Sequence, residues 1–300
     1  MAESVATFDA IAPTDRTASA TSAGWTTARR LLRHRSFQIG LGLFAVLALA
    51  ALFVPMISDA DPTKLAMRTR FVPPGVEFLF GTDNFGRSQL ARVVYGARLS
   101  LMIGTSVVVL NAIFGGALGA LSGYFHRLDN PLMRINDALM AFPPVLLAIA
   151  VTAVLGRSTP NMIVALAIVY VPRTARIVRA SVLVIRQMEF VQAAVASGAG
   201  HWRILRRHIL PNAMAPLIVQ LSFLFAYAVL TEATLSFLGL GAEPPTPTWG
   251  NIMAEGRQYM REAPWIIAIP GGALALTVMA LNLLGDGLRD VLDPRLKIQQ

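Results

Sequence analysis

The stretch LSLMIGTSVVVLNAIFGGALGAL, residues 99–121, runs for 23 residues without a charged side chain. The hydrocarbon core of a bilayer is about 30 Å thick and a helix rises about 1.5 Å per residue, so about 20 apolar residues can cross it. This stretch therefore predicts a membrane-spanning helix. Gly115, Gly119 and Gly123 recur at every fourth position, which places three small residues on one face for close packing against another helix.

Five other stretches have the same apolar character and predict further spans. The least apolar of them is 162–178, because Pro172, Arg173 and Arg176 fall in its second half. Together with residues 99–121, these stretches predict an all-α integral membrane protein with six transmembrane helices. The five further spans are expected at residues 37–57, 138–155, 162–178, 213–230 and 265–284.

The composition excludes a soluble enzyme. Of the 300 residues, 55% are hydrophobic and only 14% are charged, and the mean hydropathy is +0.57. Soluble domains carry about 25% charged residues, so a soluble fold would have too few charges to cover its surface. The net charge is +9, and 24 of the 26 basic residues are arginines that flank apolar stretches. This pattern suits contact with membrane lipid and gives no reason to expect nucleic acid as a partner.

Motifs of catalytic chemistry are missing from the sequence. Neither Lys64 nor Lys297 follows a glycine, so there is no phosphate-binding P-loop, and the H-E-x-x-H and G-x-S-x-G patterns are also absent. The chain has no cysteine, and its four histidines show no metal-ligand spacing with carboxylates. We therefore expect a non-enzymatic chain with no catalytic residue, no metal site and no cofactor of its own.

The distribution of basic residues predicts the orientation in the membrane. An even number of spans puts both termini on one side. The segments on that side hold 17 basic residues and the opposite segments hold 9. Cytoplasmic segments carry the excess of arginine and lysine, so the N- and C-termini are expected in the cytoplasm. The predicted division is 1–36, a largely disordered cytoplasmic tail; 37–58, the first helix; 59–98, an extracytoplasmic segment; 99–288, a core of five helices; and 289–300, a cytoplasmic tail.

The cytoplasmic loop 187–212 predicts two short amphipathic helices joined at Gly198 and Gly200. The first would share an apolar face of Val191, Ala194 and Val195, and the second one of Trp202, Leu205 and Ile209, with Pro211 opening the next span. Two interpretations stay open for this exposed structure. It could dock into a groove on another protein, or it could lie on anionic lipid through its arginines at positions 203, 206 and 207.

Glu232 is a charged residue in the apolar continuation of the span 213–230 toward Leu240. It could provide a polar contact near a translocation path, or it could be a carboxylate near the outer end of its helix that is bonded to a neighbour or to water. We prefer the second interpretation. The polar residues Thr105, Asn111 and Ser222 cannot rank candidate solutes.

The loop resembles the cytoplasmic coupling loop of the permeases of ABC importers. That family's pattern is Glu-Ala-Ala, three residues, Gly, nine residues, then hydrophobic-x-Leu-Pro. Here Gln192 replaces the glutamate and His208 fills the hydrophobic position. The resemblance implies that this loop contacts an ATPase through Gln192, Ala193, Ala194, Gly198, Trp202, Arg203, Arg206, His208, Leu210 and Pro211.

Four further motifs, in the same order along the chain, are similar to the dipeptide/oligopeptide/nickel branch of that family. Together with the loop they cover residues 37–295 and resemble the second, C-type permease subunit. In the first motif, Gly81, Asp83, Gly86 and Arg87 are expected to form a tight turn with a local salt bridge rather than to contact substrate. The motifs are GTDNFGR (81–87) with YGAR (95–98), LSFLGLG (235–241) with Pro244-Pro245 and Trp249-Gly250, NLLGDGLRD (282–290), which includes Asn282 and Asp286, and Asp293-Pro294.

The resemblance implies a type I ABC-importer permease fold in a bacterial inner membrane. The chain would pair with a homologous second permease, two cytoplasmic P-loop ATPases would use ATP and Mg, and an extracytoplasmic binding protein would deliver the solute. A di- or oligopeptide is the expected solute, and glutathione, a nickel complex, an opine or a sugar are the alternatives within this class. The alternatives of another class are an ATP-independent secondary transporter and a membrane scaffold. Asn282, Asp286 and Glu232 are candidates for the pathway or for helix packing.

Overall fold

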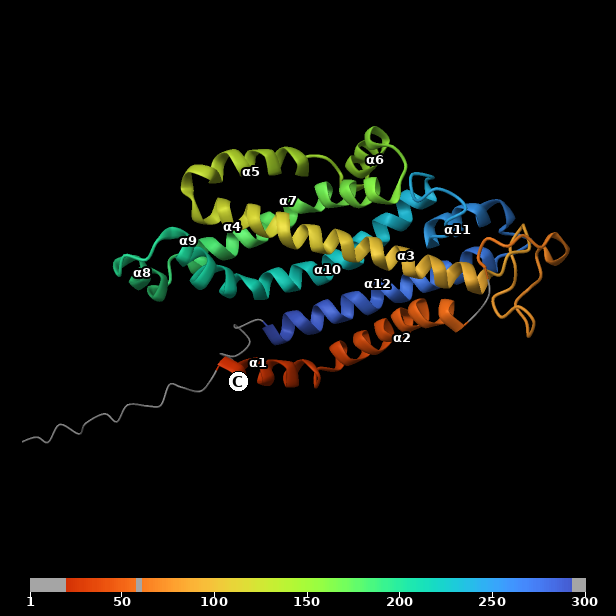
Figure 1. The fold of residues 1–300 in the computed structure, drawn as a ribbon, viewed down its shortest axis with the longest axis horizontal. Coiled ribbons are helices and arrows are strands. Elements are labelled where there is room, and N and C mark those ends of the chain that lie inside the picture. Colours follow the sequence, from red (N-terminus) through yellow and green to blue (C-terminus); the bar gives the residue numbers. More distant parts are fainter. Residues whose placement is uncertain (1–19, 58–60, 293–300) are drawn as a thin grey trace, which may run out of the picture.

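The computed structural model describes residues 20–57 and 61–292, which form a bundle of helices along one long axis (Figure 1). These residues contain no strand, only an isolated bridge between Thr82 and Ser88. The all-α prediction is confirmed. The helices are α1 (Ala20–Leu31), α2 (Arg35–Ile57), α3 (Gln89–Leu110), α4 (Gly116–Tyr124), α5 (His126–Met140), α6 (Pro144–Leu155), α7 (Thr159–Ile185), α8 (Glu189–Ala196), α9 (His201–Ile204), α10 (Leu210–Phe237), α11 (Trp249–Gly256) and α12 (Trp265–Leu292).

Five continuous helical runs within the described residues are long and apolar enough to cross a membrane. Two of them contain a π-turn: Asn111–Gly115 joins α3 to α4, and Leu205–Ile209 joins α9 to α10. A π-turn inserts one extra residue without ending a helix. The five runs are Arg35–Val54, Gln89–Tyr124, Thr159–Ile185, His201–Phe237 and Trp265–Leu292.

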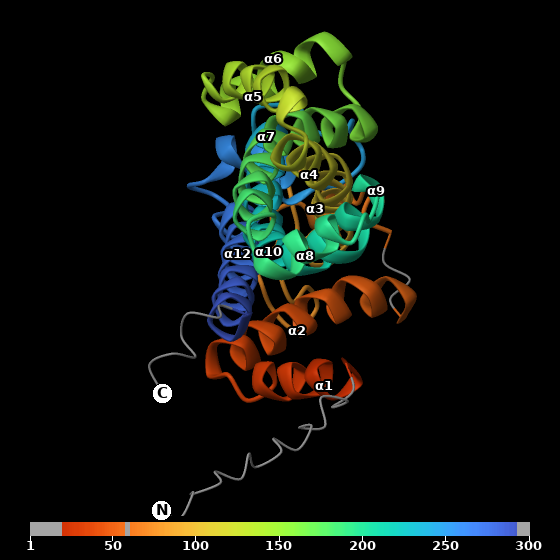
Figure 2. The same ribbon diagram turned by 90° about the vertical axis from the view of Figure 1, so that its left-hand side faces the viewer.

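The prediction of one straight span at 138–155 is wrong. Helices α5 and α6 meet at an angle of 94° at a short break, and together they provide the sixth candidate span. Pro143 lies in the break and Pro144 begins α6; both lack the N–H that a continuing helix needs, and each restricts the residue before it. Figure 2 shows α5 and α6 on one side of the bundle and α1 and α2 on the opposite side, with α7 and α10 between them.

Several helix boundaries differ from the sequence prediction. Helix α3 begins at Gln89, so the last ten residues of the segment 59–98 are helical. Helix α7 reaches Ile185, seven residues past the predicted end of its span. The sequence prediction ended each of these two spans at a charged residue. In the structure these helices contain charged residues and extend beyond them. Helix α1 lies in the stretch expected to be disordered and α12 extends to Leu292; residues 1–19 and 293–300, including Asp293-Pro294, lie outside the described residues.

The glycine face predicted in the second span packs against α7. A Cβ atom added at Gly115 would lie 2.7 Å from Thr174 Cβ, and one at Gly123 would lie 2.8 Å from Val182 Cβ. One at Gly119 would collide with the carbonyl oxygen of Ala175. The two backbones therefore touch, which only glycine permits. Helix α2 packs in a similar way on α12, where Gly40 faces the Ala280 carbonyl.

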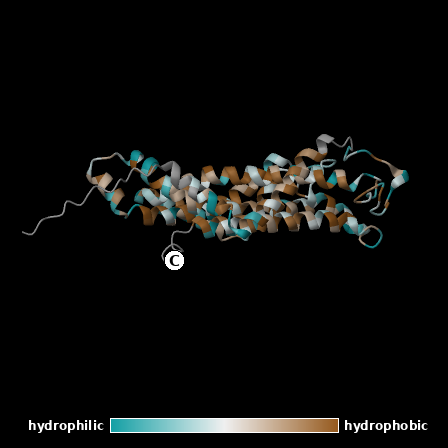
Figure 3. Ribbon diagram, turned by 90° about the horizontal axis from the view of Figure 1, so that it is seen from below, coloured by the Kyte–Doolittle hydropathy of each residue, from teal (hydrophilic) through white to brown (hydrophobic). Residues whose placement is uncertain are grey.

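Hydropathy follows the long axis of the bundle (Figure 3). Hydrophobic residues dominate its middle, and hydrophilic residues gather toward the two ends. Many large apolar side chains of the spans are exposed on the isolated chain, such as Val46, Met102 and Ile113. That arrangement suits a bundle covered by lipid and by other subunits.

Replacing Gly119 with alanine should separate α4 from α7. The added methyl group would meet rigid backbone, and overpacking of this kind costs about 1–3 kcal/mol. A lower melting temperature of the purified protein in detergent would measure the effect. Gly116→Ala on the same helix is the matched control, because its Cβ would lie 3.7 Å from Leu217, an ordinary contact. Equal melting temperatures for the two variants would contradict this packing.

Candidate functional site

The loop between α7 and α10 forms a knob, residues 187–212, at one end of the bundle (Figure 1). Helix α8 ends at a turn in which the Gly198 N–H donates to the Val195 carbonyl at 2.9 Å and the Ala199 N–H donates to the Ala194 carbonyl at 3.1 Å. This pair of bonds is a Schellman motif, and Gly198 adopts the left-handed conformation that it requires, with φ +77°. No atom lies within 4 Å of a Cβ added there, so the backbone conformation, and not space, calls for glycine.

The inner face of the knob is anchored in the bundle. Val191 of α8 is 2% exposed and Ile209 of the π-turn is fully buried. Both belong to one apolar cluster with Val182 and Ile185 of α7 and with Leu217 of α10. The knob is therefore held by the two helices that flank it, and a force on α8 reaches both of them.

The outer face of the knob is exposed and basic. Trp202 contacts the ring of Phe125 at 5.9 Å between centroids but remains 68% exposed, and Val195 is 55% exposed. Each was predicted to lie on the apolar face of its helix, and in the structure both side chains project beyond the buried apolar cluster. The side chains of Gln192, Ala193, Arg203 and Arg206 are also exposed, as is that of Arg207.

Three hydrogen bonds lie in or beside the knob: one joins it to α4, one joins the end of α7 to α4, and one lies within the knob. The Tyr124 hydroxyl lies 3.0 Å from His201 Nδ1, and Arg186 Nη1 donates to the Gly123 carbonyl at 3.0 Å. Gln192 Nε2 donates to the Gln187 carbonyl at 3.2 Å. A glutamate, which the family pattern has at position 192, could not make this last bond as a carboxylate. The side-chain amide of Gln192 thus bonds back to a carbonyl group just before the start of α8.

The second half of the knob is not a separate helix. It continues without interruption into α10, and Pro211 lies in the first turn of α10, where the sequence prediction placed it. The π-turn just before Pro211 accommodates a residue that has no N–H. Leu210 and His208 are half-buried there, and the ring of His208 lies 6.5 Å from that of Phe190. Asn212 Nδ2 donates to the His208 carbonyl at 2.6 Å.

The opposite end of the bundle carries a network of four charged residues. Asp83 is fully buried, and its Oδ2 accepts from Arg87 Nε at 2.6 Å and from Arg92 Nη1 at 2.8 Å. Its Oδ1 accepts the backbone N–H groups of Phe85 and Arg87, both at 2.9 Å. Glu255 of α11 then bonds both arginines, at 2.5 Å and 2.9 Å. The predicted turn and its salt bridge are present, within a larger network.

This network joins the loop 81–88 to α3 and α11. The turn depends on Gly81 and Gly86, both with φ +73°, and a Cβ on Gly86 would collide with the Ala66 carbonyl. Sequence reasoning missed Arg92 and Glu255 as members. Arg92 belonged to a segment expected outside the helices, and Glu255 is 172 residues from Asp83, so no spacing signal connects them.

Glu232 is a fully buried carboxylate that links α10 to α3. Its oxygens accept from the hydroxyls of Ser100 and Ser236, each at 2.7 Å. This agrees with the preferred sequence interpretation of a carboxylate near the end of its helix that is bonded to neighbours, since Glu232 lies five residues before the end of α10 at Phe237. On α12, Asn282 is half-buried and Asp286 is exposed. Within the described residues no three His, Asp or Glu side chains are grouped to hold a metal ion.

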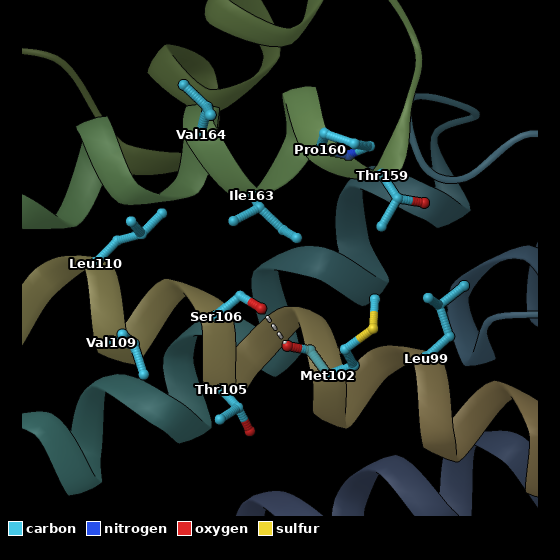
Figure 4. A pocket seen from close by; sticks show the side chains of 10 residues that line it. All are labelled: Leu99, Met102, Thr105, Ser106, Val109, Leu110, Thr159, Pro160, Ile163 and Val164. Atoms are coloured by element: carbon cyan, nitrogen blue, oxygen red, sulfur yellow. Dashed lines mark hydrogen bonds between the residues drawn. The ribbon is translucent and has the colours of Figure 1, made fainter.

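A shallow groove of about 880 Å³ lies between α3 and α7 (Figure 4). Met102, Val109 and Ile163 are among its apolar walls. Two of its hydroxyls are already bonded, since Thr105 donates to the Leu101 carbonyl and Ser106 to the Met102 carbonyl, both at 2.8 Å. The groove therefore offers a mainly apolar surface.

Comparison with known proteins agrees with this geometry. Residues 112–298 match the model of the family described as the binding-protein-dependent transport system inner membrane component. Residues 22–74 match the N-terminal TM domain of oligopeptide transport permease C. A Brucella abortus protein, provisionally named a peptide transport system permease protein, is 55% identical over 91% of this chain and 92% of its own length.

Two further relatives have similar names. A dipeptide transport system permease protein of Alkalihalophilus pseudofirmus is 43% identical over 90% of this chain and 89% of its own. A di/tripeptide transport system permease protein of Pseudomonas aeruginosa is 43% identical over 86% and 88%.

The chain belongs to the family of binding-protein-dependent transport system inner membrane components. It is a non-catalytic permease subunit of an ABC transporter complex in the inner membrane, and ATP hydrolysis in this family takes place in other subunits. The resemblance, the type I permease fold and the non-enzymatic function predicted from sequence are confirmed. An ATP-independent secondary transporter and a scaffold are not supported.

Replacing Asp83 with asparagine should loosen the loop 81–88. Two arginines would lose a buried carboxylate, and breaking a buried ion pair costs about 3–5 kcal/mol. We expect limited proteolysis to cut near this loop at least ten times faster in the variant. Glu77→Gln removes an exposed charge from the same segment and should leave the cleavage rate unchanged. Cleavage of the Asp83→Asn protein at the parent rate would show that the network does not hold the loop.

Proposed function

We propose that this chain forms half of the solute pathway of an importer. It pairs with a homologous second permease, contacts one of two cytoplasmic P-loop ATPases through the knob, and receives solute from an extracytoplasmic binding protein. ATP and Mg act in the ATPases, and this chain binds no cofactor. The family and the names of its relatives support this arrangement.

One observation carries the proposal: the knob is anchored on its inner face and exposed on its outer face. Val191 and Ile209 fix it to α7 and α10, while Trp202 and three neighbouring arginines face outward. Closure of an ATPase dimer against this outer face would therefore move both flanking helices. Contacts that differ between two states are what coupling requires.

The orientation follows from the placement of the basic residues. Helices α1, α8 and α9 and the end of α12 lie at one end of the bundle, and the loop 61–88 and α11 lie at the other (Figure 1). The knob end holds more of the basic residues, so we place it and both termini in the cytoplasm. The charge network at the other end then faces outward, where it would hold the surface that receives the binding protein.

A di- or oligopeptide is the solute that the relatives' names favour, since they are named as peptide, dipeptide and di/tripeptide permeases. The direct test purifies the binding protein that works with this transporter and measures its affinity for peptides. Tight binding of short peptides supports the assignment. Binding of glutathione, a nickel complex, an opine or a sugar, with no peptide bound, would replace it.

Substituting Gly198 with valine should uncouple ATP hydrolysis from transport. A β-branched residue is strained at φ +77°, so the turn that sets the angle of α8 would change. In the purified complex, stimulation of ATPase activity by the loaded binding protein should fall by about tenfold, the result of a distortion worth about 1.4 kcal/mol. Gly198→Asn is the matched control, because asparagine adopts this conformation more readily. Full stimulation in the valine variant would overturn the role of the knob.

A further inference from the structure

Arg173 lies deep within a membrane span. Helix α7 runs from Thr159 to Ile185, so position 173 is 14 residues from one end and 12 from the other. At about 1.5 Å per residue, this places it about 20 Å from either end. The predicted span ended at residue 178, which put Arg173 close to a membrane surface and concealed its depth.

Neighbouring helices support this depth. The Arg173 guanidinium lies over the ring of Tyr227 on α10, with Cζ 5.3 Å from the ring centroid. Two residues away on α10, the ring of Phe225 meets that of Phe44 on α2 at 5.9 Å. Phe44 is nine residues from the start of α2, well inside its apolar run. Arg173 therefore lies at the same depth along the bundle axis as the apolar part of α2.

Arg173 is exposed on the surface of the chain, as is the ring of Tyr227 at 45%. None of the carboxylates in residues 20–57 and 61–292 forms an ion pair with it. The next two arginines of α7 differ: Arg176 bonds Asp137 at 2.6 Å, and Arg179 bonds Asp129 at 2.5 Å.

An arginine at membrane depth costs about 2.5–3.5 kcal/mol on insertion scales when it faces lipid. The cost falls when it faces water or an anion. A cation–π contact with Tyr227 holds the guanidinium in place without neutralising it. The planar group keeps donors for a carboxylate, which it can bind through two parallel hydrogen bonds.

We propose that Arg173, supported by Tyr227, binds the terminal carboxylate of a peptide as it moves through the pathway. This inference rests on the proposed function, because it takes the solute to be a peptide. A fixed cation part way along an apolar path would give the carboxylate a transient site after the binding protein releases it. The required chemistry is a carboxylate at the end of a small flexible solute.

The test uses the absence of cysteine from the chain. Arg173→Cys is prepared in the complete transporter, which is reconstituted with its binding protein, and uptake of radiolabelled dialanine and trialanine is measured. Loss of one charge-assisted hydrogen bond should lower uptake about tenfold. A 2-aminoethyl methanethiosulfonate reagent, which restores a positive charge, should recover most of the uptake. The sulfonatoethyl reagent, which adds a negative charge, should not.

Arg176→Cys is the matched control, one turn away on the same helix, and should transport normally with or without either reagent. Normal uptake by Arg173→Cys, or equal effects of the two reagents, would overturn the proposal. The proposal would also be overturned if the reagents modified the thiol of Arg173→Cys only after removal of the second permease, because position 173 would then lie in the subunit interface. If the unsubstituted transporter takes up neither peptide, the proposed peptide function itself fails, which is a different result.

Discussion

The direct contact of α4 and the π-turn before it with α7, along three glycines, is the constraint on which the other features of the bundle depend. Lipid tails are as apolar as leucine, so helices in a bilayer gain little from burying apolar side chains and associate through close packing. Gly115, Gly119 and Gly123 allow this packing by bringing one backbone onto the other. The contact fixes α7, and α7 leads directly into the knob.

The packed middle of the bundle has a polar region at each end, and the two regions differ in whether their charges are paired. At the end that carries α11, Asp83 and Glu255 form ion pairs with Arg87 and Arg92, and these pairs hold the loop 81–88 in one place. At the knob end, Arg203, Arg206 and Arg207 are exposed around Trp202. A compensated network stabilises the protein's own structure, whereas an exposed basic and aromatic face suits binding to a partner.

Features that depend on local sequence were predictable. Apolar runs located the spans, the four-residue glycine period gave the face that packs on α7, and Gly198 marked the turn of the knob. Asp83 and Arg87, four residues apart, predicted their own salt bridge. Each of these features depends on residues that are close together in the sequence, and such short-range relations are visible in the spacing of residue types.

Features that depend on distant parts of the chain were not predictable. The bond of Glu232 to Ser100 joins residues 132 positions apart, so no local spacing predicts that this carboxylate is fully buried between α10 and α3. The depth of Arg173 was missed because hydropathy alone ended the span at residue 178, although Val182 and Ile185 beyond that point are buried on the same helix. The 94° bend was missed because residues 138–155 read as one apolar run despite two prolines.

The central claim is that the outer face of the knob contacts an ATPase, and site-specific photo-crosslinking tests it most directly. A benzoylphenylalanine side chain introduced at position 202 in the complete transporter should form a covalent product with a P-loop ATPase subunit. The same group at position 154, where Val154 of α6 is 86% exposed and lies away from the knob, should not. A position-202 product that contains only lipid would contradict the account and show that the knob lies on the membrane.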